Sequence, residues 1–211
     1  MADILRNFIG GRVLDIGAGS GLFCEMMNIE YYVGIELSPK MTKRAKEKFP
    51  DKHFSVADMH RLPFPDDSFD SAVSLYGPLS CSLEPENLLT EITRVVRPGG
   101  CVALMPYTLR VEHKLEIGGY STATEESIEK IFYTDKSLRQ LMSPLEDVQI
   151  IGINYFLNTY IRFVQTMNLG DKQSLDLFIR FLQKEKDFQT MLPAEYARHM
   201  IGIGRKSSLG R

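Results

Sequence analysis

The sequence has few cysteines and no excess of either charge. Its three cysteines, Cys24, Cys81 and Cys101, are widely separated and form no Cys-x-x-Cys pair. We therefore expect reduced thiols and neither a disulfide framework nor a metal site. Lysines and arginines number 25 against 27 aspartates and glutamates, which leaves no general basic field to attract nucleic acid or an anionic lipid surface.

Long apolar runs are also missing. No segment approaches the roughly 18 apolar residues that a membrane-spanning helix requires. The first ten residues include Asp3 and lack the apolar core of a signal peptide. We therefore expect no membrane insertion, no secretion and a cytoplasmic location.

The composition that remains is that of one globular domain. The chain has 211 residues, of which 44% are hydrophobic and 25% charged, enough for a core that needs no covalent staple. We expect a single domain over residues 1–211. Because strand one is expected about twelve residues from the first residue, no N-terminal substrate-binding domain is expected.

The first hundred residues alternate strand and helix patterns, which predicts βαβ units and a parallel, doubly wound sheet. Arg97-Pro98-Gly99-Gly100 is interpreted as the end of a helix that precedes strand five. In the second half, Thr122 and Glu125 stand at the capping-box spacing, and two aromatic-rich helical stretches lie between residues 156 and 182. The strands are predicted at 12–16, 31–37, 53–57, 69–75, 101–105, 147–155 and 197–205.

The most informative segment is Val13-Leu14-Asp15-Ile16-Gly17-Ala18-Gly19-Ser20-Gly21. Glycines between a strand and a helix let a ligand approach the backbone closely, although a tight turn can need glycine for its own geometry. A dinucleotide fingerprint would need glycine or alanine where Leu22 stands, and no lysine follows to make a phosphate-binding loop. The pattern that remains is acid-x-G-x-G-x-G.

The segment 14–23 resembles motif I of the class I S-adenosylmethionine-dependent methyltransferases. The resemblance continues in order through Glu36, Ala57-Asp58, the segment 62–70 (LPFPDDSFD) and the segment 94–100. It covers about residues 10–106 and is nearest to the branch that includes ubiquinone- and menaquinone-biosynthesis enzymes. It implies a Rossmann-like seven-stranded sheet, mostly parallel with an antiparallel last strand, and helical insertions over the carboxyl edge.

The resemblance also implies S-adenosyl-L-methionine as cofactor, S-adenosyl-L-homocysteine as product, and a role for each site residue. Glu36 would accept hydrogen bonds from the ribose hydroxyls, Asp58 from the adenine amino group, and Asp15 would favour the ammonium group. Each acid also has a purely structural interpretation. Glu36 could be a solvated acid at a strand end, Asp58 a turn or helix-cap residue, and Asp15 a support for the glycine turn. The remaining cofactor-binding residues implied are Gly17, Ala18, Gly19, Leu37, Met41, Met59 and Leu75, of which Met41 could instead pack in the core.

On the acceptor side, Tyr76, Tyr107 and His113 are the candidates for a catalytic role, and each could equally be a lining or surface residue. His60 is interpreted as a surface histidine. Leu75-Tyr76-Gly77-Pro78-Leu79 replaces the Asn/Asp-Pro-Pro-aromatic run of methyltransferases that act on adenine or glutamine amino groups, which argues against that branch.

We expect a small-molecule methyl acceptor, covered by residues 107–146 and 156–196, whose aromatic residues could also form a homodimer contact. Alternatives left open are a methyltransferase that acts on a protein or a tRNA, and a non-catalytic partner subunit. A nicotinamide-dependent oxidoreductase is disfavoured by Leu22.

Overall fold

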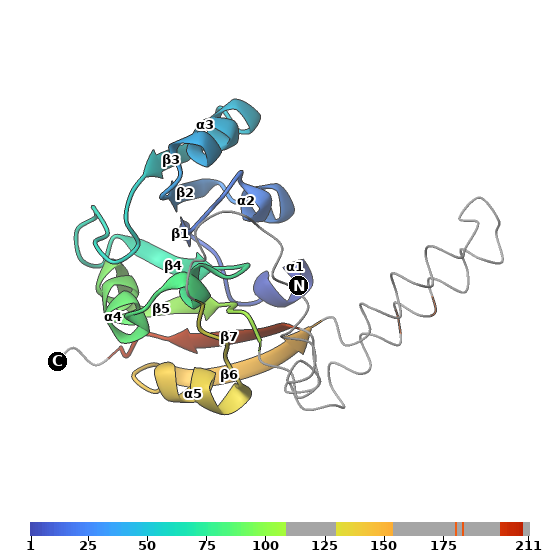
Figure 1. The fold of residues 1–211 in the computed structure, drawn as a ribbon, viewed down its shortest axis with the longest axis vertical. Coiled ribbons are helices and arrows are strands. Elements are labelled where there is room, and N and C mark those ends of the chain that lie inside the picture. The colour runs from blue at the N-terminus through green and yellow to red at the C-terminus, as the bar shows by residue number, and fades with distance from the viewer. Residues whose placement is uncertain (109–129, 154–179, 181–182, 184–198, 209–211) are drawn as a thin grey trace.

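The computed structural model describes residues 1–108, 130–153, 180, 183 and 199–208 (Figure 1). In these parts of the chain, seven strands form one sheet in the order β3-β2-β1-β4-β5-β7-β6. The strands are β1 (Arg12–Ile16), β2 (Tyr31–Glu36), β3 (His53–Val56), β4 (Phe69–Ser74), β5 (Val96–Leu104), β6 (Glu146–Ile153) and β7 (His199–Arg205). The helices are α1 (Ala2–Leu5), α2 (Leu22–Met27), α3 (Pro39–Lys48), the 3-10 helix η1 (Pro78–Cys81), α4 (Pro85–Val95) and α5 (Asp135–Leu141).

The directions of the strands confirm the predicted fold. Strands β1 to β5 pair in parallel, whereas β7 is antiparallel to both of its neighbours, β5 and β6. The chain runs from β1 outward to β3 and returns to β4 on the other side of β1. The carboxyl ends of β1 and β4 therefore meet at the switch point, where ligands bind in open α/β sheets.

Helices cover both faces of the sheet, as strand alternation requires (Figure 1). One buried cluster joins Val13 of β1 to residues of α1, α2 and α3, and the other joins Leu14 to residues of α4 and α5. Helix α3 begins as predicted, with Pro39 in its first turn and the Ser38 hydroxyl accepting a hydrogen bond from the Met41 amide at 3.4 Å. Within the described residues, no helix is long and apolar enough to span a bilayer.

Two sequence predictions need correction. Strand β5 begins at Val96, where it pairs with Phe69, and not after the glycine pair. The strand continues across Pro98-Gly99-Gly100 for two reasons. Gly99 adopts a positive φ of 74°, and Gly100 has no side chain where the Asp70 carbonyl comes close. Helix α5 was not predicted; it is capped by Thr134 and Ser137. The predicted cap at Thr122 and Glu125 and the helical stretches of residues 156–182 lie outside the described residues, apart from Arg180, which is helical.

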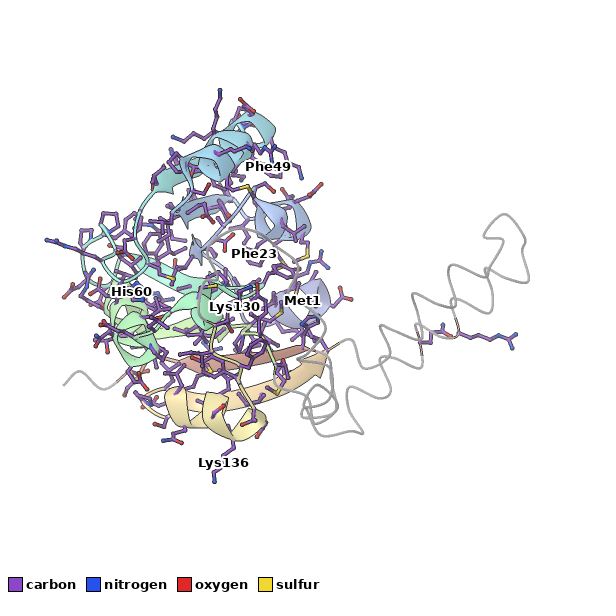
Figure 2. All side chains as sticks on the ribbon, in the orientation of Figure 1. Met1, Phe23, Phe49, His60, Lys130 and Lys136 are labelled. Carbon is purple, nitrogen blue, oxygen red and sulfur yellow. The ribbon has the colours of Figure 1, made fainter. Side chains whose placement is uncertain are left out.

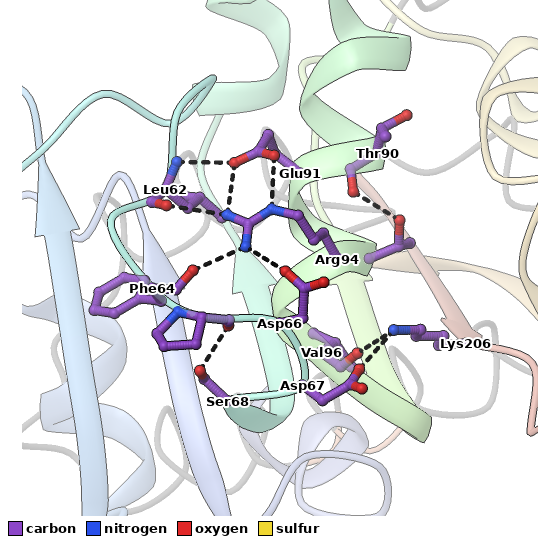
Figure 3. Close-up of polar contacts among 12 residues, drawn as sticks. Leu62, Phe64, Asp66, Asp67, Ser68, Thr90, Glu91, Arg94, Val96 and Lys206 are labelled. Carbon is purple, nitrogen blue, oxygen red and sulfur yellow. Dashed lines mark hydrogen bonds and ion pairs between the residues drawn. The ribbon is translucent and has the colours of Figure 1, made fainter. Parts of the chain in front are cut away.

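One arginine fastens the segment that follows β3 to α4 (Figure 3). The Arg94 guanidinium donates two hydrogen bonds to the Glu91 carboxylate at 2.8 and 2.9 Å. It also donates to the carbonyls of Leu62 and Phe64 at 3.0 and 2.8 Å, and to the Asp66 carboxylate at 2.8 Å. Residues 62–66 are therefore fixed against α4, and with them the stretch that leaves the carboxyl end of β3.

Candidate functional site

The glycine turn after β1 is shaped by three left-handed residues. Gly17, Gly19 and Gly21 have φ angles of 73°, 55° and 88°, a region that residues with a Cβ enter at a cost. A Cβ on Gly17 would overlap Pro78, and one on Gly21 would lie 2.7 Å from the Phe49 ring. These two positions therefore need glycine for the packing of the protein itself.

Gly19 differs from its two neighbours. The nearest atom to a Cβ at this position would be Cε of Met41, at an ordinary contact distance of 3.8 Å. The protein therefore leaves space over the middle of the turn, and half-buried Met41 lies beside that space. The two residues that α3 buries in the core are Thr42 and Ala45, so Met41 lies at the edge of the core next to the turn.

Glu36 ties the glycine turn to the start of α3. One carboxylate oxygen accepts a hydrogen bond from the Gly19 amide at 3.0 Å, and the other accepts one from the Ser38 amide at 2.9 Å. The acid at the end of β2 is thus held by two backbone amides and is only partly exposed. Each oxygen keeps a second lone pair that can accept a hydrogen bond from a ligand.

Asp15 is buried beneath the turn, with 2% of its surface exposed. Its carboxylate accepts a hydrogen bond from the Tyr32 hydroxyl at 2.6 Å. Burial raises the pKa of Asp15 to about 7, the Tyr32 hydrogen bond opposes this rise, and the charge of Glu36 adds to it. Asp15 is thus one member of a buried hydrogen-bonded pair, and near neutral pH it exists in both charge states.

This titration predicts that Asp15 destabilises the folded protein as the pH rises. The pKa is higher in the folded chain than the ordinary value of 3.8, so its contribution to stability is fully present below pH 3.8 and lost as the pH rises through about 7. Asp15→Asn removes the titration. Relative to this variant, the wild type should lose roughly 2–3 kcal/mol of unfolding free energy between about pH 5 and about pH 8. Urea unfolding at both pH values measures the difference, and a constant difference would contradict the assigned titration.

Asp58 leaves the carboxyl end of β3 as a turn residue with an exposed side chain. Its Oδ1 accepts a hydrogen bond from the His60 amide at 2.9 Å and lies 3.1 Å from His60 Nδ1. The backbone hydrogen bond from His60, followed by the side-chain one, lowers the pKa of Asp58. Met59, between them, is partly buried against the cluster under α4. The turn role given as an alternative is therefore present, in a side chain that is 60% exposed.

The acceptor-side candidates come from the loops that follow β4 and β5. Leu75 is buried, whereas Tyr76 is 42% exposed and has a positive φ of 62°. A Cβ on Gly77 would overlap the Tyr107 ring, so the two loops pack tightly together. Tyr107 is anchored by its amide, which donates to the Ser80 hydroxyl at 2.7 Å. The structure brings Tyr76 and Tyr107 to neighbouring loops of one edge, whereas His113 lies outside the described residues.

Burial, followed by the charge of Asp15, raises the pKa of Tyr76. A phenol with a raised pKa stays protonated at neutral pH and serves as a hydrogen-bond donor more readily than as a base. Tyr107 is surrounded by an aromatic and a basic residue: its ring centroid lies 6.1 Å from that of Phe132 and 5.6 Å from the Lys130 ammonium. The two tyrosines therefore supply a polar, partly aromatic border beside the glycine turn.

The comparisons with known proteins agree with this geometry. Residues 14–104 match the family model described as a methyltransferase domain. The phosphatidylethanolamine N-methyltransferase of Cereibacter sphaeroides is 37% identical over 111 residues, 49% of this chain and 54% of that protein. A demethylmenaquinone methyltransferase of Paenarthrobacter aurescens is 34% identical over 111 residues, 51% of this chain and 43% of that protein. The chain thus spans about half the length of these curated relatives.

Solved structures share the fold over nearly the whole chain. A Thermotoga maritima methyltransferase, described as a possible histamine N-methyltransferase, has a TM-score of 0.68 at 16% identity and covers 97% of this chain and 86% of its own. Phosphoethanolamine N-methyltransferase 2 of Haemonchus contortus, bound to S-adenosyl-L-methionine, has a TM-score of 0.64 at 17% identity and covers 97% of this chain and 51% of its own. At these identities the likeness establishes the fold alone.

The sheet order is that of the Rossmann-like fold found in solved methyltransferase structures. Residues 14–104, less than half of the chain, are similar to the methyltransferase-domain family.

Proposed function

We propose that this protein is an enzyme that transfers the methyl group of S-adenosyl-L-methionine to a small organic acceptor and releases S-adenosyl-L-homocysteine. The observation that carries the proposal is the pairing of Gly19 with Glu36. The turn leaves room for a ligand where a side chain would otherwise stand, and a carboxylate fixed by two backbone amides borders that room. In nucleotide-binding sites, glycines after the first strand let a ligand approach the backbone closely, and an acid at the end of the second strand accepts hydrogen bonds from the ribose hydroxyls.

The residues at this edge match the parts of the cofactor. In the proposed complex, Glu36 accepts hydrogen bonds from the ribose hydroxyls, and Asp58 accepts one from the adenine amino group, with the Met59 backbone beside the ring. Leu37, which is 70% exposed at the end of β2, and Met41 border the nucleoside. The backbone of residues 17–19 faces the amino-acid portion, the buried Asp15 carboxylate beneath the turn would favour its ammonium group, and Leu75 lies near the methyl group.

Bound S-adenosylmethionine supplies an electrophilic methyl group on a sulfonium centre, so the task left to the protein is alignment. Tyr76 and Tyr107 would border the acceptor and orient it by hydrogen bonding, which the raised pKa of Tyr76 favours over proton abstraction. His113 stays a candidate for a catalytic role. We assign cofactor binding to residues 10–106 and acceptor covering to residues 107–146 and 156–196, within a single domain over residues 1–211.

The net charge of the chain and the names of its relatives favour one class of methyl acceptor. The net charge of −2 offers no general attraction for nucleic acid, and the relatives are named for phosphatidylethanolamine, demethylmenaquinone and malonyl-[acyl-carrier protein]. A small-molecule or lipid acceptor is therefore favoured over a tRNA. The free state of Cys24, Cys81 and Cys101 supports a cytoplasmic location, and the proposal includes a homodimer.

The test of the proposed function is transfer of a labelled methyl group. Purified protein is incubated with methyl-labelled S-adenosylmethionine and, separately, with phosphatidylethanolamine, phosphoethanolamine or a demethylmenaquinone as small-molecule acceptors, and with bulk protein or tRNA as the alternatives. We expect protein-dependent label in one of the small-molecule acceptors. Cofactor binding with label only in bulk protein or tRNA would contradict the acceptor class, and binding with no transfer at all would favour the partner-subunit alternative.

Glu36→Ala should weaken binding of S-adenosylhomocysteine by roughly 1–3 kcal/mol, because a charge-assisted acceptor is lost at a partly buried site. Calorimetric titration measures the change. Glu47→Ala is the matched control, since this glutamate lies exposed on α3 in a loose 3.9 Å pair with Lys43 and should not alter affinity. Equal affinities of the two folded variants would remove Glu36 from the site.

A further inference from the structure

His60 joins the turn at the end of β3 to the chain that enters α4. The imidazole lies between two partners, with Nδ1 3.1 Å from Asp58 Oδ1 and Nε2 2.8 Å from the Ser82 hydroxyl. Figure 2 shows this side chain next to α4. The sequence had suggested a surface histidine, but the ring is only 31% exposed and forms a bridge between segments 22 residues apart.

The Asp58 carboxylate fixes one hydrogen of the imidazole. A carboxylate can only accept, so Nδ1 of His60 donates to Asp58 Oδ1. Nε2 lies 2.8 Å from the Ser82 hydroxyl, whose oxygen accepts a hydrogen bond from the Glu84 amide at 3.2 Å. The bridge therefore joins the turn before α4 to the Asp58 carboxylate.

An aspartate, a histidine and a serine in this order resemble a hydrolytic triad, but burial argues against that chemistry. Ser82 is fully buried, with 0% of its surface exposed, so no substrate carbonyl can reach its hydroxyl. The exposed end of the bridge is Asp58, whose side chain is 60% exposed. Any ligand would therefore meet the carboxylate, and the histidine and serine stand behind it.

We propose that His60 is a positioning residue, which holds Oδ1 of Asp58 so that Oδ2 faces the exocyclic amino group of the adenine ring. The inference rests on the proposed function. Oδ1 of Asp58 has two hydrogen-bond partners, the His60 amide and the His60 ring. Together they restrict the side-chain torsion of Asp58 more than a single hydrogen bond would. Ser82, fixed by the chain before α4, keeps the ring itself in place.

The test compares two ligands that differ at the edge of the base that carries the amino group. S-inosylhomocysteine has a carbonyl oxygen in place of the amino group of S-adenosylhomocysteine, and a hydrogen on the adjacent ring nitrogen, so a change in the ratio of their dissociation constants between wild type and variant reports the contact with Asp58. The wild type should prefer the adenosyl compound by roughly tenfold or more, the size expected for a hydrogen bond to a charged group. His60→Leu should reduce this preference several-fold through weaker binding of the adenosyl compound, with binding of the inosyl compound unchanged. His53→Gln is the control, at an exposed histidine that starts β3, and should keep the wild-type preference.

A purely structural role predicts a different result. If His60 only stabilised the fold, His60→Leu would have a lower melting temperature and would bind both ligands more weakly by the same factor. An unchanged ratio of the two dissociation constants would overturn the inference. Equal affinity of the wild type for both compounds would overturn it as well, while leaving the proposed function intact. Binding of neither compound by the folded wild type would instead overturn the proposed function.

Discussion

A valine at Gly19 is expected to abolish binding of S-adenosylmethionine in a protein that still folds. The protein has room for a Cβ at this position, with Met41 Cε 3.8 Å away, so the added side chain would occupy the space assigned to the ligand. The φ of 55° at Gly19 costs a residue with a side chain about 1–2 kcal/mol in stability. Calorimetry should therefore show a loss of affinity of roughly a hundredfold or more, as for a ligand whose backbone approach is blocked.

Gly99→Val is the control that separates the stability cost of a side chain at a positive φ from the loss of ligand binding. Gly99 has a comparable φ of 74°, a Cβ on it would lie 3.4 Å from Ser208 Oγ, and it lies in β5 away from the glycine turn. This variant should lose a similar amount of stability and keep its affinity. Wild-type affinity in a folded Gly19→Val protein would show that the turn does not contact the cofactor.

Gly17→Ala should instead destabilise the fold, by about 2–5 kcal/mol. A left-handed φ costs roughly 1–2 kcal/mol, and overlap of the new Cβ with Pro78 adds roughly 1–3 kcal/mol of overpacking. The loop after β4 would have to shift to relieve the overlap. The urea midpoint of unfolding measures this effect directly.

Gly10→Ala is the matched control for this variant. Gly10 lies just before β1, and no atom would lie within 4 Å of its Cβ, so the change should be neutral or slightly stabilising. Equal unfolding midpoints for Gly17→Ala and Gly10→Ala would mean that the turn does not pack against Pro78 as described.

Much of the fold could be predicted because the strands are short apolar segments separated by clear turn residues. The edges of β1 to β4 follow this pattern within one residue, although the strand order and the antiparallel last strand came from the family resemblance. Strand β5 was predicted too short because Pro98-Gly99-Gly100 is typical of a helix end. The register of its pairing with β4 shifts between Phe69 and Ser71, next to the Asp70 backbone that approaches Gly100, and a linear pattern does not contain this contact.

The candidate site was predictable in its residue types and not in its contacts. Acids at the ends of β2 and β3 are visible in the sequence, but their partners depend on strand register. Asp15 pairs with Gly34 across β1 and β2, which places Tyr32 diagonally opposite, on the same face, where its hydroxyl reaches the carboxylate. His60 and Ser82 come together through the packing of the loop after β3 against α4, which no local spacing specifies.

The central claim is that the edge formed by β1, β2 and β3 binds S-adenosylmethionine, and calorimetric titration of the purified protein tests it most directly. The ligands are S-adenosylmethionine, S-adenosylhomocysteine and NADH. We expect the first two to bind and NADH not to bind, because Leu22 occupies the position where a dinucleotide fingerprint has glycine or alanine. Binding of NADH alone, or of none of the three by the folded protein, would contradict the central claim.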